Sequence, residues 1–194
     1  MNDSVLTRER ILEVAEDVLR RYGPTKATVV DVARVLGVSH GSVYRHFPSK
    51  AALRDAVAEL WLARLSEPLA GVVTEEGPAV NRLRHWFDVL ISAKRSRALD
   101  DPELFATYVE LVAESRDVVK AHVDHLVGQV AQIIADGIAE GTFSVDDALT
   151  SGRAVFYATV RFHDPAHAKQ WSDPAIDTAF ESVWSLILRG LGAA

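Results

Sequence analysis

Three side chains that can read hydrogen-bonding edges, His40, Ser42 and Arg45, lie close together in one short segment. Within the same segment only Val43 and Phe47, four residues apart, could anchor a helix to an apolar core. A helix that uses so few side chains for packing leaves the others free to bind a partner. Imidazole, hydroxyl and guanidinium groups are the donors and acceptors that contact base edges in the major groove of DNA. The segment therefore predicts a short helix that reads a DNA sequence.

A second set of residues around this helix suits the DNA backbone. Tyr44, His46 and Lys50 are donors to phosphate oxygens, contacts that fix register without reading sequence. Gly41 costs a helix about 1 kcal/mol relative to alanine, yet it lets the backbone approach DNA closely; a packing contact with another helix is the alternative. Thr28 and Ser39, which would cap two helices, complete the set. The predicted DNA contacts are Thr28, Ser39, His40, Gly41, Ser42, Tyr44, Arg45, His46 and Lys50.

The residues before this segment are those of a helix that would hold it in place. Apolar residues recur at helical spacing between positions 29 and 36, and Thr28 with Asp31 predicts a capping box. Gly37 follows where a left-handed residue commonly ends a helix, and Ser39 would cap the next helix. A merely polar helix face is the alternative, but a glycine turn with caps on both sides favours a helix-turn-helix.

The stretch TVVDVARVLGVSHGSVYRHFPSK resembles the DNA-binding domain of TetR-family transcriptional regulators. The resemblance is dense from about Arg10 to Leu60 and includes the YRHF-x-SK signature. It implies a DNA-binding domain over residues 1–53, which includes the start of a connector helix over 49–67. It also implies an effector-binding and dimerisation domain over 54–194, a part that differs from member to member of the family.

Composition narrows the class of protein further. The chain has 194 residues, of which 48% are hydrophobic and 25% charged, and it contains no cysteine. These proportions are typical of a globular protein, and disulfides and cysteine metal sites are excluded. The N-terminus has no apolar signal-peptide core, and no apolar run approaches the roughly 20 residues that span a bilayer. We therefore expect a cytoplasmic protein with no membrane partner.

The net charge of −6 hides an uneven distribution. Residues 1–55 carry a net charge of +2, whereas residues 56–194 carry −8. Within residues 26–54 five basic side chains face one acidic side chain, so the positive charge is concentrated on the predicted DNA-binding motif. The acidic remainder would repel DNA and so help to orient the molecule.

Helical periodicity extends through the chain, and neither sustained alternation nor a hairpin turn predicts a strand. We expect an all-α protein of about nine helices after a loose arm at residues 1–6. Pro68 should end the connector helix, and Ser144 should cap the eighth helix. Besides the two motif helices and the connector, the predicted helices cover about 7–22, 79–98, 100–115, 116–140, 144–162 and 173–191.

The last two predicted helices are unusually apolar. Ala148, Gly152, Ala154 and Ala158 would allow another helix to approach closely. A large internal core is one explanation for such helices. The resemblance implies another, a homodimer in which these helices pair with those of a second subunit. Dimerisation would also place two DNA-reading helices about 34 Å apart on a palindromic operator.

Aromatic residues are numerous after the motif and could line an apolar pocket for a small-molecule effector. Most aromatics at helical spacing belong to a core, and the sequence does not identify the effector. The predicted pocket residues are Trp61, Trp86, Phe87, Phe105, Tyr108, Phe156, Tyr157 and Phe162.

Histidines suggest a different occupant. If the seventh and eighth helices form a hairpin, equal distances from its turn bring His122, His125, His163 and His167 to one end of the bundle. With Asp124 or Asp164 nearby, such imidazoles would suit a divalent ion such as zinc or nickel. The alternative is that these histidines are exposed or hydrogen-bonded. No cofactor is required by any motif.

Three functions compete. The leading one is a dimeric repressor that a small molecule releases from its operator. The second is a DNA-bound activator or organising protein without an inducer, or a metal-responsive regulator. The third is an enzyme, but no nucleophile motif or glycine-rich phosphate loop is present. Capping of helix starts better explains the candidate carboxylates Asp100, Asp101, Glu103, Glu110 and Glu114.

Overall fold

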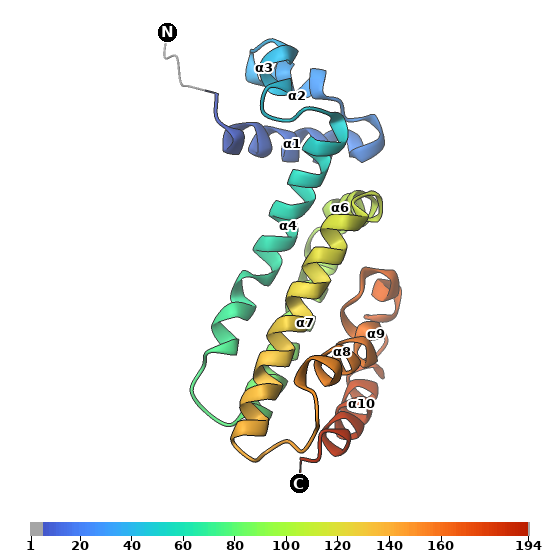
Figure 1. Ribbon diagram of the computed structural model, residues 1–194. Helices are drawn as coiled ribbons and strands as arrows, with labels where there is room; N and C mark the ends of the chain where they lie inside the picture. Colours follow the sequence, from blue (N-terminus) through green and yellow to red (C-terminus); the bar gives the residue numbers. More distant parts are fainter. Residues whose placement is uncertain (1–5, 194) are drawn as a thin grey trace. The chain divides into compact units, whose positions relative to one another are not determined.

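The computed structural model describes residues 6–193, in which every regular element is helical (Figure 1). The predicted all-α class is therefore confirmed. None of these helices combines the length and apolar character that crossing a lipid bilayer requires. The elements are α1 (Arg8–Lys26), α2 (Val29–Leu36), α3 (His40–Tyr44), α4 (Lys50–Val73), α5 (Ala79–Asp100), α6 (Pro102–Glu114), α7 (Arg116–Ala139), α8 (Ala148–Ala158), α9 (Val160–His163), the 3₁₀ helix η1 (Pro165–Gln170) and α10 (Ile176–Gly190).

The described helices form two compact units. Unit 1 comprises residues up to Leu62 together with Asp101–Lys120, and unit 2 comprises Ala63–Asp100 together with the residues from Ala121 onward. Helices α4 and α7 therefore contribute residues to both units. The sequence predicted a boundary after residue 53 between a DNA-binding and an effector-binding domain. The two packing units do not test that functional division, so it stays a prediction. The predicted arm at residues 1–6 lies outside the described residues except for Leu6.

Unit 1 is built around the helix-turn-helix. Helix α2 packs against α1 and α3, and α6 also packs against α1. Ile11 and Val18 of α1, Val32 of α2, and Val43 with Phe47 around α3 are all buried in one core. Helices as short as α2 and α3 are unstable in isolation, so this shared core is what holds the DNA-reading segment in place.

Unit 2 contains a larger aromatic core. Trp86 and Phe87 of α5 and Phe162 of α9 are buried with the apolar faces of α7 and α10. Gly152 lets α8 approach α7 closely, because a Cβ atom at this position would lie 2.9 Å from the backbone nitrogen of Ala131. The close approach predicted for Gly152 is therefore used inside the chain.

Several predicted helix ends differ from the structure. Helix α1 has a break at Gly23, whose φ of 74° is left-handed, but helical structure resumes as far as Lys26. Helix α4 continues through Pro68 to Val73. The prediction that it ends by Pro68 was wrong, because Leu69 and Val72 beyond the proline are buried in unit 2 and keep the helix packed.

The eighth predicted helix also differs. Asp147, not Ser144, caps α8 by accepting a hydrogen bond from the backbone N–H of Thr150. Near Thr159 the helix divides into α8 and α9, and η1 occupies the loop that follows. These two additional segments account for eleven helical elements in the described part of the chain where about nine were expected.

Candidate nucleic-acid interface and effector region

The predicted caps and turn of the helix-turn-helix are confirmed. The backbone N–H of Asp31 donates to Thr28 Oγ1 over 3.2 Å, and the N–H of Thr28 donates to Asp31 Oδ2 over 3.1 Å. The hydroxyl and the backbone N–H of Thr28 both donate to the Asp31 carboxylate, and these bonds hold the pKa of Asp31 below its ordinary value. Gly37 ends α2 with a left-handed φ of 68°, and Ser39 Oγ accepts from the N–H of Ser42 over 3.2 Å.

Helix α3 separates its packing residues from its polar residues. Val43 and Phe47 are buried, as predicted, whereas Tyr44 is 41% exposed. None of the nine predicted DNA-contact residues is buried, and only Ser42 and His46 are partly covered. The polar side chains are therefore available at the surface of unit 1. Whether they contact DNA stays a prediction.

Hydrogen bonds order part of this surface. Ser39 Oγ and Ser42 Oγ are 2.9 Å apart, and Arg45 Nη2 lies 3.3 Å from Ser42 Oγ. The rings of His40 and Tyr44 meet edge to face with centroids 6.3 Å apart. These contacts restrict the orientation of the side chains, which lowers the entropy lost when a partner binds.

Gly41 lies on the same surface. The nearest atom to a Cβ placed on it, apart from its own helix backbone and chain neighbours, would be Ser39 Oγ at 3.8 Å. Among residues 6–193 no neighbouring helix approaches Gly41, so the packing explanation for this glycine is not supported. The open space instead agrees with a backbone that approaches an external partner.

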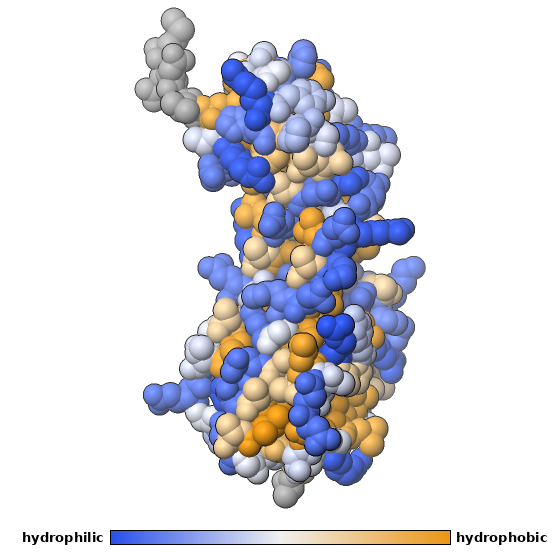
Figure 2. Space-filling view, in the orientation of Figure 1, coloured by the Kyte–Doolittle hydropathy of each residue, from blue (hydrophilic) through white to orange (hydrophobic). Residues whose placement is uncertain are grey.

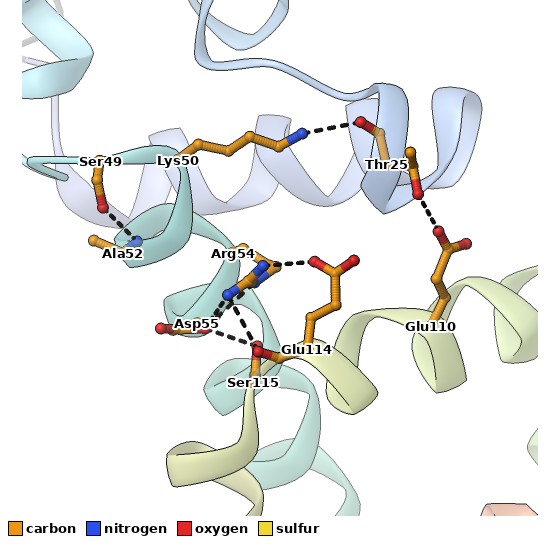
Figure 3. A network of polar contacts seen from close by, with 9 residues as sticks. All are labelled: Thr25, Ser49, Lys50, Ala52, Arg54, Asp55, Glu110, Glu114 and Ser115. Carbon is orange, nitrogen blue, oxygen red and sulfur yellow. Dashed lines mark hydrogen bonds and ion pairs between the residues drawn. The ribbon is translucent and has the colours of Figure 1, made fainter.

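A polar network in unit 1 joins α6 to the helix-turn-helix region (Figure 3). Lys50 Nζ donates to the backbone oxygen of Thr25 over 3.0 Å, and Thr25 Oγ1 donates to Glu110 of α6. Lys50, predicted to contact a phosphate, is thus also linked to α6 through a single residue.

A second branch of this network centres on Arg54 of α4. Its guanidinium donates to the carboxylate of Glu114 and, over 3.2 Å, to the backbone oxygen of the same residue. Ser115 Oγ donates to Asp55 Oδ1 over 2.7 Å. Glu110 and Glu114, considered above as catalytic carboxylates, are thus bound to unit 1 side chains. Their spacing of four residues, which puts them on one face of α6, was the signal that could have indicated contacts with the same neighbouring region.

Ion pairs neutralise part of the positive charge that the sequence concentrates on the motif. Arg34 pairs with Asp31 over 2.8 Å, and Arg54 pairs with Glu114. Among the residues that the structure describes, Lys26, Arg45 and Lys50 have no ion-pair partner. The remaining positive charge thus lies at the end of α1, at the end of α3 and at the start of α4, where DNA phosphates would be attracted. Figure 2 shows hydrophilic residues over much of the visible face of unit 1.

The predicted pocket residues fall into two groups. Trp61, Phe105 and Tyr108 lie in unit 1, where the Tyr108 ring is 6.0 Å from each of the other two. Unit 2 holds the remaining five. Of these Trp86, Phe87, Phe156 and Phe162 are buried, whereas Tyr157 is 55% exposed. A role in effector binding stays a prediction for all eight.

The four histidines do not form the predicted metal site. Among the described residues, no group of three or more His, Cys, Asp or Glu side chains could hold a metal ion. Instead, His125 Nε2 lies 3.0 Å from Gln129 Nε2, and His163 Nε2 lies 3.2 Å from Thr159 Oγ1. The hydrogen-bonded alternative therefore describes His125 and His163, and the metal prediction is dropped.

Lys94 is a feature that the sequence did not reveal. Lys94, Arg95 and Arg97 lie toward the C-terminal end of α5, where basic residues interact favourably with the helix dipole without any partner. In the structure the Lys94 side chain is buried, with 6% exposed. Burial lowers its pKa to about 8, and nearby Asp164 opposes the shift. A buried lysine with a lowered pKa is a candidate for ligand binding.

Exposed apolar residues occur on the last helices. Leu149 and Tyr157 of α8 and Leu186 of α10 are each more than half exposed. Ala154 and Ala158 of α8 are exposed as well. Figure 2 shows hydrophobic residues among hydrophilic ones on the visible face of unit 2. Such residues are available for a contact with a second subunit.

In the described part of the chain, an exposed, capped helix-turn-helix on a packed helical unit has the features of a DNA-binding regulator. Residues 79–184 match the family model "Tetracyclin repressor-like, C-terminal domain", and residues 11–57 match "Bacterial regulatory proteins, tetR family". The chain therefore belongs to the TetR family of bacterial regulatory proteins, which is not a class of enzymes.

Relatives and solved structures agree with this family. The nucleoid occlusion factor SlmA of Vibrio cholerae is 31% identical over 100 residues, and the match spans about half of each protein, 50% of this chain and 51% of SlmA. GusR of Salmonella enterica has the same fold, with a TM-score of 0.65, 20% identity and coverage of 97% and 98%. FadR of Bacillus subtilis, solved in complex with stearoyl-CoA, has a TM-score of 0.61, 18% identity and coverage of 95% and 99%.

Proposed function

We propose that this protein is a dimeric transcriptional repressor that binds a palindromic DNA operator and leaves it when a small molecule binds unit 2. The observation that carries the proposal is the exposed, hydrogen-bonding face of α3 on a packed helix-turn-helix. His40, Ser42 and Arg45 contact base edges, while Tyr44 and Lys50 bind phosphates.

The exposed apolar residues of α8 and α10 support dimerisation. Leu149, Tyr157 and Leu186 each lose contact with water when two subunits pair through these helices. A twofold dimer presents two copies of α3 to the two halves of a palindrome. Replacing Leu149 and Leu186 with glutamate would bury charges in such an interface, so the double variant should be monomeric and bind DNA weakly.

The aromatic core of unit 2 supports a small-molecule effector. Trp86, Phe87 and Phe156 supply the apolar surface that ligand sites in proteins generally have. FadR, which shares this fold, was solved with stearoyl-CoA. The effector releases DNA because it binds better to a conformation that does not bind the operator.

The network in unit 1 supplies a route for this change to reach α3. Helix α6 bonds to Arg54 through Glu114 and to Thr25 through Glu110, and Thr25 accepts a hydrogen bond from Lys50. A shift of α6 therefore repositions Lys50, which lies beside the end of the DNA-reading segment.

A second candidate function is a DNA-bound organising protein without an inducer. The similarity to the nucleoid occlusion factor SlmA favours it. Both functions require DNA binding through α3, but only the repressor loses DNA affinity when a small molecule binds. A ligand-dependent rise in the dissociation constant for the operator distinguishes the two functions.

Selection of bound sequences from a randomised DNA pool tests the proposal. The repressor should enrich a palindrome, and its affinity should fall steeply as salt concentration rises. The Tyr44→Ala variant should lose most of the enrichment, while the matched control Tyr22→Ala, which changes an exposed tyrosine of α1 outside the predicted contacts, should retain sequence preference. No enrichment by the intact protein would contradict the proposal.

A further inference from the structure

Unit 2 brings together basic side chains that an apolar core does not require. Lys94 of α5 and His163 of α9 are 6% and 4% exposed, and His122 of α7 is partly buried. Helix α5 packs against α9, where Phe87 lies beside His163, and the charge of Lys94 acts on both histidines. We call these three residues the basic cluster.

Burial makes positive charge unfavourable in the basic cluster. Burial, together with the charge of Lys94, lowers the pKa of His122 to about 4 and that of His163 to about 3. His125 adds to the effect on His122, and Arg97 adds to the effect on Lys94. The carboxylate of Asp164 is the charge that opposes the shift at Lys94.

Hydrogen bonds show which ring nitrogens of the histidines already have partners. The hydroxyl of Thr159 donates toward the backbone oxygen of Phe156 over 2.9 Å, so its oxygen accepts from His163 Nε2. This arrangement fixes the ring of His163 beside Phe156, with centroids 4.8 Å apart.

The neighbouring residues on α7 are fixed in the same way. Trp86 Nε1 can only donate, so the 2.9 Å bond to Gln129 uses the amide oxygen. The amide nitrogen of Gln129 then donates to His125 Nε2 over 3.0 Å. By contrast, His122 Nε2 is buried and has no hydrogen-bond partner among the described residues. A buried, unsatisfied ring nitrogen is costly to a fold, and a ligand that bonds to it removes the cost.

We propose that the basic cluster binds the anionic group of the effector, and that the effector is therefore an organic acid. The carboxylate accepts hydrogen bonds from Lys94 Nζ and His122 Nε2, and its negative charge offsets the cost of burying positive charge. The apolar part of the acid packs against the rings of Phe87 and Phe156, which flank His163. This inference rests on the proposed function of unit 2 as the effector domain.

The proposal predicts that binding takes up protons. A carboxylate beside Lys94 and His122 favours their charged forms and raises both pKa values. Between about pH 5 and 8, where free His122 is neutral, binding of the acid should therefore remove protons from the buffer. Calorimetry of one acid in two buffers with different ionisation enthalpies measures this uptake.

A matched panel of ligands tests the class of effector. The intact protein is titrated with straight-chain carboxylates of two to twelve carbons and with phenyl-substituted carboxylates, each paired with its neutral amide. Thermal stability and intrinsic tryptophan fluorescence report binding. At least one acid should bind at least ten times more tightly than its amide. Its binding should also take up protons.

Two lysine variants serve as test and control. Lys94→Met keeps the apolar stem and removes the charge, and it should bind the acid and its amide equally well. Lys169→Met removes an exposed lysine of η1 in the same unit and should keep the preference for the acid. Retained fold of Lys94→Met is checked by its unfolding transition.

Three outcomes would overturn the inference. They are equal binding of acids and amides by the intact protein, failure of every acid to bind, and an unchanged acid preference in Lys94→Met. Operator binding by the same preparations is measured in parallel. If the operator binds but no acid does, the inference fails while DNA recognition stands, whereas failure to bind any DNA sequence-specifically refutes the proposed function itself.

Discussion

The two units place their basic side chains in opposite environments. In unit 1, Arg45 and Lys50 are exposed, where their charge is solvated until a polyanion arrives. In unit 2, Lys94 and His163 are buried, and their pKa values are lowered because the interior disfavours positive charge. The first arrangement suits reversible attraction of DNA, and the second suits selective binding of a small anion.

The difference also concerns what each unit loses when a side chain is removed. The exposed residues of α3 contribute little to packing, so their replacement should alter binding and leave stability unchanged. Burial of the basic residues in unit 2 disfavours their charged forms, so their replacement should alter stability as well as binding. The following predictions test this contrast, starting from the largest effect.

Truncation of a buried residue beneath α3 should have the largest effect on stability. Phe47→Ala removes an aromatic ring that is 1% exposed, and we expect a loss of 3 to about 5 kcal/mol in the free energy of unfolding of unit 1. Urea denaturation measures it. Val35→Ala, at a residue of α2 that is 63% exposed, is the control and should change stability by less than about 0.5 kcal/mol. Equal effects would mean that α3 is not held by this core.

Acid should destabilise unit 2 through its buried histidines. Because the pKa of His163 falls from 6.5 to about 3 on folding, the unfolded chain binds a proton that the folded chain does not between these values. Stability therefore falls as pH decreases from about 6.5, by about 3 kcal/mol at pH 4 from this residue. His163→Phe should flatten the profile measured by urea denaturation, whereas His85→Gln, at an exposed histidine, should not. A profile of His163→Phe as steep as that of the unmodified protein would contradict the prediction.

Removal of the buried lysine charge should stabilise unit 2. The pKa of Lys94 falls from 10.5 to about 8, so its burial is unfavourable below pH 8, and this cost disappears as pH rises toward 10.5. Lys94→Met should raise the free energy of unfolding by about 1 to 3 kcal/mol at pH 7 and by much less at pH 10. Denaturation at both pH values checks this, and a variant less stable at pH 7 would show that Lys94 supports the fold.

Replacement of Lys50 should have the smallest effect, a change in the salt dependence of DNA binding. If its ammonium binds a phosphate, Lys50→Ala reduces the slope of log K against log salt by about 0.9. Fluorescence anisotropy with the selected operator at several salt concentrations measures the slope. Lys169→Ala is the matched control. An unchanged slope would limit Lys50 to its contact with the backbone of Thr25.

The sequence predicted the DNA-binding motif well because its signals are local. The capping box of Thr28 and Asp31, the left-handed Gly37 and the cap Ser39 each act within a few residues, and all are confirmed. The buried positions of Val43 and Phe47 followed from helical spacing alone. The assignment of these surface residues to DNA contacts agrees with their exposure and stays a prediction.

Features that depend on residues far apart in the sequence were harder to predict. Lys94 looked like a basic residue near a helix end, and only packing against other helices buries it. The partners of Glu110 and Glu114 lie more than fifty residues away in the sequence. Pro68 predicts the end of a helix, but α4 continues past it, because the packing of Leu69 in unit 2 outweighs the hydrogen bond that proline removes.

Sequence discrimination by Arg45 gives the most direct test of the account. Dissociation constants are measured by anisotropy for the selected operator and a scrambled duplex, with the intact protein and Arg45→Ala. We predict that the intact protein prefers the operator by at least a thousandfold. Arg45→Ala should lose ten- to a hundredfold of this preference while its affinity for the scrambled duplex changes little. Equal affinity of the intact protein for both duplexes, or an unchanged preference in Arg45→Ala, would contradict the assignment of α3 as the element that reads DNA.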